Sequence, residues 1–332
     1  MKPKTGCFLV SKKANFLVDW LSFTIRLSDI RRNDEIDLFD LITSKLFLKG
    51  LDYQERRAMH GYMTAWASNG ITICFGGRDD IFINFSGSGC RAFEEINDKN
   101  LSWEKYLSHL FMVYQSLHVS RLDIACDTFG RLNLMNLIRY TRKGQYISQW
   151  RTYLVQEGNK ELSVVFGSKC SDFRCRLYDK TLERVSAGAG DVPLNWVRIE
   201  FQMRDETALS FLKKWIGQQL PISDVFLGIL QNQLMYYTSY DGKNRDRMRV
   251  VGWWKSLIGD TERMKMSYQG GMEYNCERLR LYVLKQAASS INAYVQMFGV
   301  NDLKKSVEHV RLNDRQKALL ASAEVVAAPW DM

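Results

Sequence analysis

The sequence predicts an α+β protein in which an antiparallel β-sheet carries the functional site and helices pack behind it. Two observations predict this class. Up to about residue 203, short segments rich in aromatic and β-branched residues alternate polar and apolar side chains, as strands with one buried face do. From about residue 205, apolar residues recur every three or four positions, which is typical of amphipathic helices. Hydrophobic residues make up 46% of the chain and prolines number four, so a large ordered core is expected.

The first third of the chain is predicted to contain a strand, a helix, a hairpin and a second helix. The second helix is favoured by Trp103, Tyr106 and Leu110, which fall on one stripe at helical spacing. The glycines of 87–89 are expected to form a turn, because the Lys-Ser/Thr of a phosphate-binding loop does not follow them. The predicted bounds are 16–27 for the first strand, 34–49 for the first helix, 71–77 and 80–89 for the hairpin, and 102–117 for the second helix.

Strands and then helices are predicted for the rest of the chain. The strands are recognised by alternation and by their aromatic and β-branched content. The helices are recognised by their apolar spacing, and the last of them forms a helical C-terminal segment. The predicted strands are 118–130, 161–167, 173–180 and 196–203, and the predicted helices are 206–220 and 278–298.

Charge and cysteine content limit the classes of protein that need considering. The net charge is +9 with a pI of about 9.1, which is compatible with a polyanionic partner. The seven cysteines include no CxxC and no Cys/His pair at zinc-ligand spacing, which favours reduced thiols in a cytosolic protein. No segment approaches the ~20 apolar residues of a membrane helix, and the N-terminus has no signal-peptide pattern. We therefore expect a cytoplasmic protein of a bacterial host, with no membrane partner.

Three predicted strands have an apolar back and an ionisable front. Successive side chains of a strand point to opposite faces, so residues two apart share a face. If the three strands are neighbours in one sheet, their fronts form a single surface with carboxylates, basic groups and a tyrosine. These front residues are Arg121, Asp123 and Asp127 on the first strand, Arg174, Arg176, Tyr178 and Lys180 on the second, and Arg198, Glu200 and Gln202 on the third.

Such a surface has the groups that phosphoryl transfer requires. Carboxylates close together repel, so a cation usually accompanies them, and oxygen ligands suit Mg²⁺ or Mn²⁺. A metal ion polarises phosphorus, tyrosine is a suitable nucleophile, and arginine and lysine bind the phosphate backbone. The same alternation is also typical of the solvent face of a half-exposed sheet, with structural ion pairs between its strands. Periodicity alone leaves both interpretations open.

Several strings, in order along the chain, resemble the Rep_trans family of rolling-circle replication initiators. FGSKCSDFRCRLYDKTLER (166–184) resembles the family's active-site segment, with its Gly-Ser, its Ser-Asp and its Arg-x-Tyr-x-Lys followed by Glu. SRLDIACD (120–127) and WVRIEFQMR (196–204) resemble its two acidic strands. VDWLSFT (18–24), FSGSGCRAFE (85–94) and GWWKSLIGD (252–260) resemble segments on either side. The family comprises replication proteins of small plasmids, with relatives among integrative-element relaxases and the RstA-type proteins of filamentous phages.

The resemblance implies a replication initiator that nicks one strand of origin DNA. Tyr178 matches the catalytic tyrosine, which would remain on the 5′ phosphate and leave a 3′ hydroxyl primer. Arg176 and Lys180 belong to the same catalytic motif. Asp123, Asp127 and Glu200 match the family's acidic positions and are assigned to Mg²⁺ or Mn²⁺. The implied fold resembles the HUH endonucleases without their histidine pair, since His60, His109, His118 and His309 are isolated in the sequence.

The resemblance also implies partners and a domain organisation. The partners would be origin DNA that is partly single-stranded or a hairpin, a host helicase and polymerase, and a second copy in a homodimer. We expect a β-rich N-terminal domain at 1–116, a nicking and joining domain at 117–260, and a helical segment at 261–332. A conjugative relaxase of an integrative element, and a non-catalytic DNA-binding regulator with the same fold, are the alternatives.

Origin recognition is assigned in part to the stretch 236–255, which mixes basic and aromatic residues. Basic side chains suit phosphates, and aromatic rings suit stacking on unpaired bases. A charged loop followed by a buried tryptophan pair is the alternative for Trp253 and Trp254. The predicted DNA-binding residues are Lys243, Arg245, Arg247, Arg249 and Lys255 in this stretch, with Arg121 and Arg174 on the strands.

Overall fold

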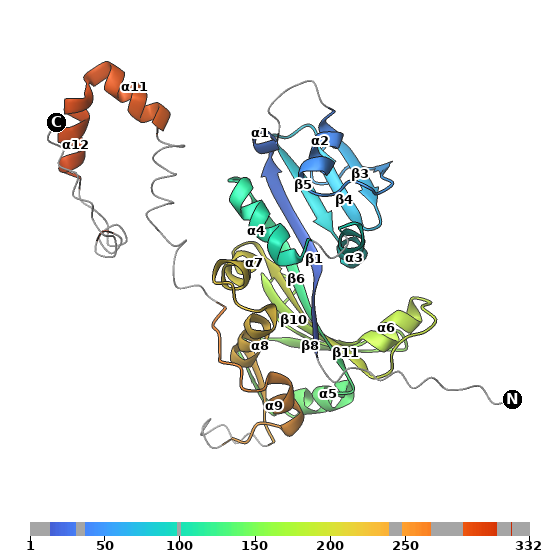
Figure 1. Ribbon diagram of the computed structural model, residues 1–332. Helices are drawn as coiled ribbons and strands as arrows, with labels where there is room; N and C mark the ends of the chain where they lie inside the picture. The colour runs from blue at the N-terminus through green and yellow to red at the C-terminus, as the bar shows by residue number, and fades with distance from the viewer. Residues whose placement is uncertain are drawn as a thin grey trace. The chain divides into compact units, whose positions relative to one another are not determined.

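The computed structural model describes residues 14–30, 37–97, 101–238, 248–266, 288–310 and 320. The chain divides into two compact units, Met1–Ser267 and Tyr268–Met332. Almost all regular structure of the first unit belongs to one ten-stranded sheet and the helices that pack on it (Figure 1). Among the described residues, no helix combines the length and the apolar character needed to cross a membrane.

The ten-stranded sheet is antiparallel and consists of two halves that meet at its two longest strands. These are β1 (Asn15–Arg26) and β6 (His118–Phe129), which pair along most of their length. The strand order is β2-β3-β4-β5-β1-β6-β11-β10-β9-β8. The central strands β1 and β6 are therefore flanked by β5 and β11, the last strands of the N-terminal and the C-terminal half. The outer strands are β2 (Gln54–Arg56), β3 (Thr64–Ser68), β4 (Ile71–Phe75), β5 (Asp80–Phe85), β8 (Tyr153–Glu157), β9 (Leu162–Phe166), β10 (Phe173–Asp179) and β11 (Trp196–Arg204).

Helices cover one face of this sheet, which we call the back face. In the N-terminal half, Phe85 of β5 contacts Phe93 of α3 and Tyr106 of α4. In the other half, Phe201 of β11 stacks on Phe226 of α8 with ring centroids 4.1 Å apart. The helices of this unit are α1 (Leu27–Ile30), α2 (Leu38–Lys45), α3 (Gly87–Ile96), α4 (Trp103–Val113), α5 (Leu134–Arg142), α6 (Lys180–Ser186), α7 (Asp205–Leu212), the π-helix η1 (Lys213–Gly217), α8 (Ile222–Gln233) and α9 (Gly252–Ile258).

The structure differs from the sequence-based prediction at residues 87–89. These residues begin helix α3 and do not form a plain turn. Ser86 is the N-cap, and its hydroxyl accepts a hydrogen bond from the Gly89 amide. Gly89 is needed for packing, because a Cβ at this position would lie 2.4 Å from the Gly70 carbonyl oxygen. The predicted glycine turn is therefore a capped helix start pressed against the β3–β4 turn.

Short strands that carry little periodicity were not predicted. Besides β2, β3 and β8, the structure contains a two-stranded sheet of β7 (Tyr146–Ser148) and β12 (Leu234–Tyr236). The three-residue strands β2, β7 and β12 give too few alternations to be recognised in a sequence. The second unit is described from α11 (Ala288–Phe298) to α12 (Val300–Glu308), where the Tyr294 hydroxyl donates to Asp302.

Candidate active site

The face of the sheet opposite the helices, the front face, gathers the ionisable residues of β6, β11 and β10. Strand pairing aligns Asp127, Arg198 and Tyr178 in one row across the three strands. The next row contains Glu200 beside Arg176, and the row after it aligns Asp123, Gln202 and Arg174. The three strands are thus neighbours with their ionisable sides on a common face.

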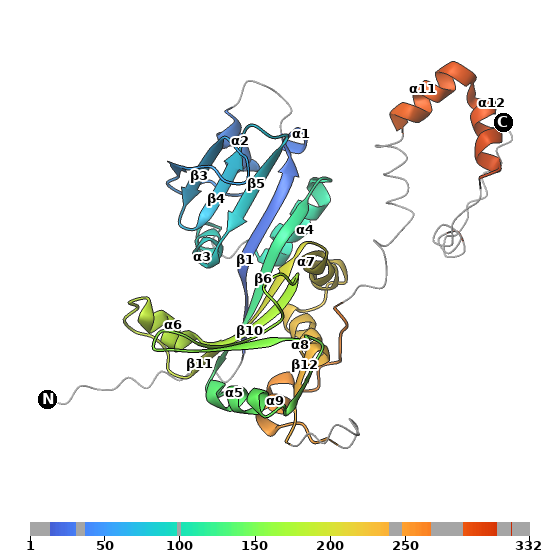
Figure 2. The same cartoon turned by 180° about the vertical axis from the view of Figure 1, so that it is seen from behind.

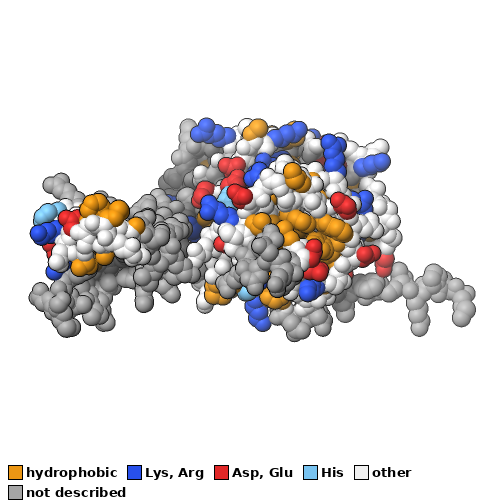
Figure 3. Space-filling view, turned by 90° about the horizontal axis from the view of Figure 1, so that it is seen from above, with side chains coloured by type: hydrophobic (Ala, Val, Ile, Leu, Met, Phe, Trp, Pro, Cys, Tyr) orange, Lys and Arg blue, Asp and Glu red, His pale blue; other side chains and the backbone are white. Residues whose placement is uncertain are grey.

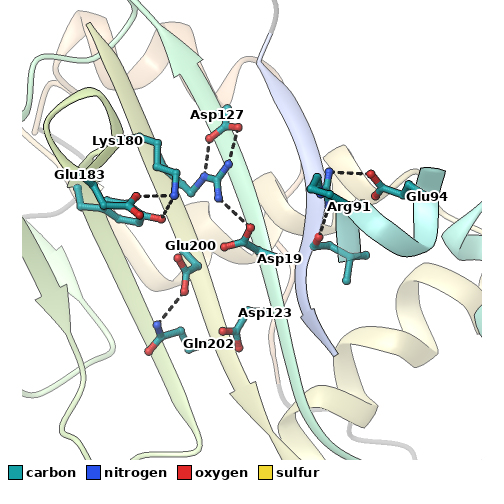
Figure 4. Close-up of polar contacts among 12 residues, drawn as sticks. Asp19, Arg91, Glu94, Asp123, Asp127, Lys180, Glu183, Glu200 and Gln202 are labelled. Atoms are coloured by element: carbon teal, nitrogen blue, oxygen red, sulfur yellow. Dashed lines mark hydrogen bonds and ion pairs between the residues drawn. The ribbon is translucent and has the colours of Figure 1, made fainter. Parts of the chain in front are cut away.

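A buried arginine links two carboxylates at the centre of this face (Figure 4). Arg198 donates from Nε and Nη2 to the two oxygens of Asp127 at 2.7 and 2.8 Å, and from Nη1 to Asp19 at 2.8 Å. Asp127 and Arg198 are 3% and 5% exposed, so the pair is shielded from water. Because both oxygens of Asp127 are occupied, this carboxylate holds Arg198 in place in the described arrangement.

Asp19 was not among the predicted site residues. It lies on β1 between Val18 and Trp20, where the pairing with β6 shifts register. A bulge of this kind redirects side chains, so simple alternation does not assign the facing of Asp19 and its neighbours. The available signal was an acidic residue within an otherwise apolar strand, VDWLSF.

Asp123 and Glu200 form an acidic pair next to the arginine. Burial, together with the charges of Glu200 and Asp19, raises the pKa of Asp123 to about 7, although the hydrogen bond and the charge of Arg121 act in the opposite direction. Arg121 pairs with Asp123 through Nη2 at 2.6 Å, and Gln202 donates to Glu200 at 2.8 Å. Asp123 and Glu200 are 2% and 5% exposed. The site therefore contains more buried negative charge than its arginines neutralise.

Tyr178 is buried beside this acidic pair and beneath two cationic side chains. Burial raises the pKa of its phenol, and the charge of Glu200 raises it further. The Arg176 guanidinium lies 4.1 Å from the ring centroid, and the Lys180 Nζ lies 3.5 Å from the hydroxyl. Lys180 also contacts Glu183, and Arg176 donates to Glu161 at 2.9 Å. The phenol is therefore protonated at rest, with a lysine at its oxygen.

The donor chemistry of the site fits a hard divalent cation, although the described arrangement is not a closed metal cage. Among the described residues, no three Asp, Glu, His or Cys side chains converge closely enough to hold an ion. Asp123 and Glu200 lie on neighbouring strands, and the charge of Glu200 contributes to the raised pKa of Asp123, so a cation beside them would offset their repulsion. Carboxylate oxygens without histidine or cysteine suit Mg²⁺ or Mn²⁺. His118 lies outside this group, because it is 60% exposed and contacts Asp205.

The predicted DNA-binding residues lie in different environments. Lys243, Arg245 and Arg247 fall outside the described residues. Lys255 is exposed on α9, and the Arg249 carbonyl accepts from Thr238 beside the β12 end. Arg174 is half-buried on the front face.

Trp253 and Trp254 pack in the protein interior. Trp254 is completely buried, and its indole donates to the Leu234 carbonyl at 3.2 Å. Trp253 packs on Tyr236 and Tyr140. The buried-pair alternative is therefore correct for Trp254.

The fold is similar to that of a solved rolling circle replication initiator protein from Geobacillus stearothermophilus. The two structures align with a TM-score of 0.63 and 23% sequence identity, over 78% of this chain and 100% of that chain. Likeness at this identity establishes a shared fold, and it confirms the predicted α+β class. No curated protein matches the sequence.

The family of replication initiation factors, Rep_trans, matches residues 117–309, which is more than half of the chain. The protein belongs to this family, and its role is the initiation of replication. The resemblance recognised in the sequence is confirmed.

Proposed function

We propose that this replication initiator nicks one strand of origin DNA with Tyr178 as the nucleophile and so starts rolling-circle replication. The observation that carries the proposal is the cross-strand row of Tyr178, Arg198 and Asp127, with Lys180 at the phenol oxygen and Glu200 in the adjacent row. A family of replication initiation factors and a fold shared with a rolling circle initiator support it.

The proposed reaction is an in-line displacement at one phosphodiester. The Tyr178 oxygen loses its proton and forms a bond to phosphorus, while the bond from phosphorus to the 3′ oxygen breaks. The 5′ phosphate remains on the tyrosine, and the leaving 3′ oxygen takes up a proton to become the primer hydroxyl. This covalent intermediate conserves the phosphodiester energy for later rejoining.

Each neighbouring side chain has a role that follows from its position. Lys180, at 3.5 Å from the phenol oxygen, stabilises the phenolate, whose pKa burial otherwise raises. Glu200 is the carboxylate with the largest charge effect on the phenol, and we assign it as acceptor of the phenol proton. Arg176, stacked on the ring, is placed to bind the phosphate. Asp127 and Asp19 keep Arg198 oriented.

We assign the divalent cation, Mg²⁺ or Mn²⁺, to Asp123 and Glu200, with Asp127 at the border of its site. When bound, the ion would polarise the scissile phosphate and offset charge in the transition state. The proposal keeps the predicted domain division after residues 116 and 260. It also keeps the predicted partners, which are origin DNA with a hairpin or single-stranded segment, a host helicase and polymerase, and a second copy in a homodimer. The 236–255 stretch is retained as its origin-recognition segment.

A nicking assay tests the proposal. Supercoiled origin plasmid is incubated with the full chain and Mg²⁺ or Mn²⁺, and open-circle DNA and a protein–DNA adduct are measured. Tyr178→Phe should abolish both products while it leaves origin binding within about twofold, because only the hydroxyl is lost. Tyr153→Phe, at an exposed tyrosine on β8, is the matched control and should nick normally.

Two outcomes would contradict the assignment. Nicking by Tyr178→Phe would show that another residue is the nucleophile. A gel shift by the unmodified chain, without nicked product under either metal, would favour the non-catalytic regulator. A conjugative relaxase would give the same products on a transfer origin, so the two are separated by comparing both origin plasmids as substrates.

A further inference from the structure

The N-terminal half of the sheet repeats the architecture of the half that carries Tyr178, but without its chemistry. Strands β5 and β4 occupy, beside β1, the places that β11 and β10 occupy beside β6. On the front face, β4 presents Thr72 and Cys74, and β5 presents Phe82 and Asn84, where the other half presents its tyrosine and carboxylate. A surface of the same form that has neither the tyrosine nor the acidic pair is suited to binding.

Among the described residues, no helix covers this front face, as Figure 2 shows from the side opposite α2 and α4. The loop around His60 and Tyr62 covers one corner, where both rings pack on Phe82. The rest is made of small polar side chains aligned across the strands, because Thr72 pairs with Asn84, which pairs with Ser22. The row continues through Ser22 to Arg121 of β6, directly beside the site.

An ordered tryptophan lies where this surface meets the acidic pair. Trp20 is half-buried and is the strand partner of Asp123. Its indole donates to the Ser22 hydroxyl at 2.8 Å, and that hydroxyl donates to Asn84 at 2.7 Å. The Arg121 guanidinium lies 4.0 Å from the Trp20 ring centroid and also pairs with Asp123. A fixed aromatic ring and a stacked arginine thus stand next to the catalytic groups.

The charge of the surface is complementary to a nucleic acid backbone. Arg121 and the exposed Arg204 are strand partners on its border with the site. Arg26 lies at the far end, next to an ion pair at 2.9 Å in which Arg78 and Asp80 neutralise each other. Figure 3, which looks down on the molecule from above, shows basic and acidic side chains interspersed around a hydrophobic patch.

We propose that the front face of the N-terminal half binds single-stranded DNA continuous with the scissile strand. The platform consists of Trp20, Thr24, Thr72, Asn84 and Arg121, and the hydroxyl of the buried Ser22 links Trp20 to Asn84. One base stacks on Trp20, and its neighbouring phosphates contact Arg121, while the small side chains let the strand approach the sheet closely. Single-stranded DNA is preferred over duplex because its unpaired bases are free to stack. The inference rests on the proposed function for the identity of the ligand.

Binding is measured separately from cleavage, so the two proposals fail independently. The full chain carrying Tyr178→Phe is titrated in EDTA against fluorescein-labelled dT30, and anisotropy is recorded. Trp20→Ala should weaken binding by about tenfold, as loss of one base-stacking contact does, and Trp20→Phe by less than about threefold. Thr72→Glu should also weaken binding, because it places a negative charge on the platform.

Met112→Glu is the matched control, because it adds the same charge at a side chain that is 78% exposed on α4, on the helix-covered side. It should bind dT30 as the parent does. Circular dichroism and the melting temperature check that each variant folds. Photo-crosslinking of a bromodeoxyuridine oligonucleotide to the parent chain, followed by peptide mass spectrometry, should identify a peptide containing Trp20.

Four results would overturn the proposal. The first is parental affinity in both folded Trp20→Ala and folded Thr72→Glu. The second is a crosslink that maps only to other segments. The third is equal affinity for a 30-base-pair duplex with equal sensitivity to the substitutions, which would assign the platform to duplex DNA. The fourth is a change of oligomeric state by Thr72→Glu with unchanged dT30 affinity, which would assign the platform to a second copy of the chain. Failure of Tyr178→Phe to abolish nicking would affect only the catalytic assignment.

Discussion

Replacing Asp123 by asparagine should stabilise the folded protein at high pH and leave its stability at low pH nearly unchanged. The Asp123 carboxyl has an ordinary pKa of 3.8, and in the folded chain burial and its acidic neighbours raise the pKa to about 7. The folded chain therefore keeps the proton over a range in which the unfolded chain has lost it. Stability from this group is greatest at low pH and falls as the pH rises from about 4 to about 7.

The size of this effect follows from the pKa difference. The folded and unfolded pKa values differ by about three units, and each unit corresponds to roughly 1.4 kcal/mol. Above pH 7, the ionised carboxyl therefore lowers the free energy of unfolding by up to about 4 kcal/mol. The asparagine side chain cannot ionise, and its carbonyl oxygen still accepts a hydrogen bond from Arg121. Relative to the parent, Asp123→Asn should therefore gain stability progressively between about pH 4 and about pH 7, and the gain should reach a maximum of about 4 kcal/mol above pH 7.

Urea unfolding in EDTA, followed by tryptophan fluorescence at pH 5 and pH 8, measures the effect. Asp191→Asn, at an exposed carboxyl in the α6–β11 connection, is the matched control and should give the same small difference at both pH values. A stability difference for Asp123→Asn that does not change with pH, or one that becomes unfavourable at pH 8, would refute the argument. It would mean that Arg121 and the surrounding dipoles already compensate the charge.

Three other predictions concern the cation, the buried ion pair and the helix start. Mn²⁺ should stabilise the parent chain at pH 8 and much less at pH 6, because Asp123 must lose its proton to bind the ion. Asp123→Asn should abolish this stabilisation, which is measured by thermal melts with and without Mn²⁺. Arg198→Met should lower the free energy of unfolding by about 3–5 kcal/mol, because it leaves Asp127 buried without a partner. In urea unfolding, the double variant with Asp127→Leu should recover part of this loss, and a fully additive loss would contradict the pairing. Gly89→Ala should destabilise by about 1–3 kcal/mol, because its Cβ would lie 2.4 Å from the Gly70 carbonyl oxygen, while Gly190→Ala, with open space around its Cβ, should be neutral in the same measurement.

Alternation along the sequence was sufficient to predict the strands that carry the site and the face each residue occupies. Asp123 and Asp127, Arg198 and Glu200, and Arg176 and Tyr178 were placed on common faces by their spacing of two or four. This worked because β11 pairs with β6 and with β10 without a register shift, and because the back faces of the three strands are mostly apolar. The long strands were predicted for the same reason, and apolar spacing predicted α2, α4 and α7, whereas α5 was not predicted and α8 and α9 were given no bounds. Of the predicted helix 278–298, residues 278–287 lie outside the described residues.

The order of the strands, and hence the site, was decided only in the tertiary structure. Which strands become neighbours depends on long-range pairing, and no local pattern encodes that β11 lies between β6 and β10. The same pairing brings the bulged Asp19 of β1 to Arg198, 179 positions away in sequence. In the folded chain, Asp127 forms an ion pair with Arg198, and Trp20 and the small side chains of the N-terminal half lie beside the site. Local sequence thus determines which side of a strand is apolar, whereas contacts between distant strands determine which charges meet, because their energies depend on burial and distance that exist only in the folded chain.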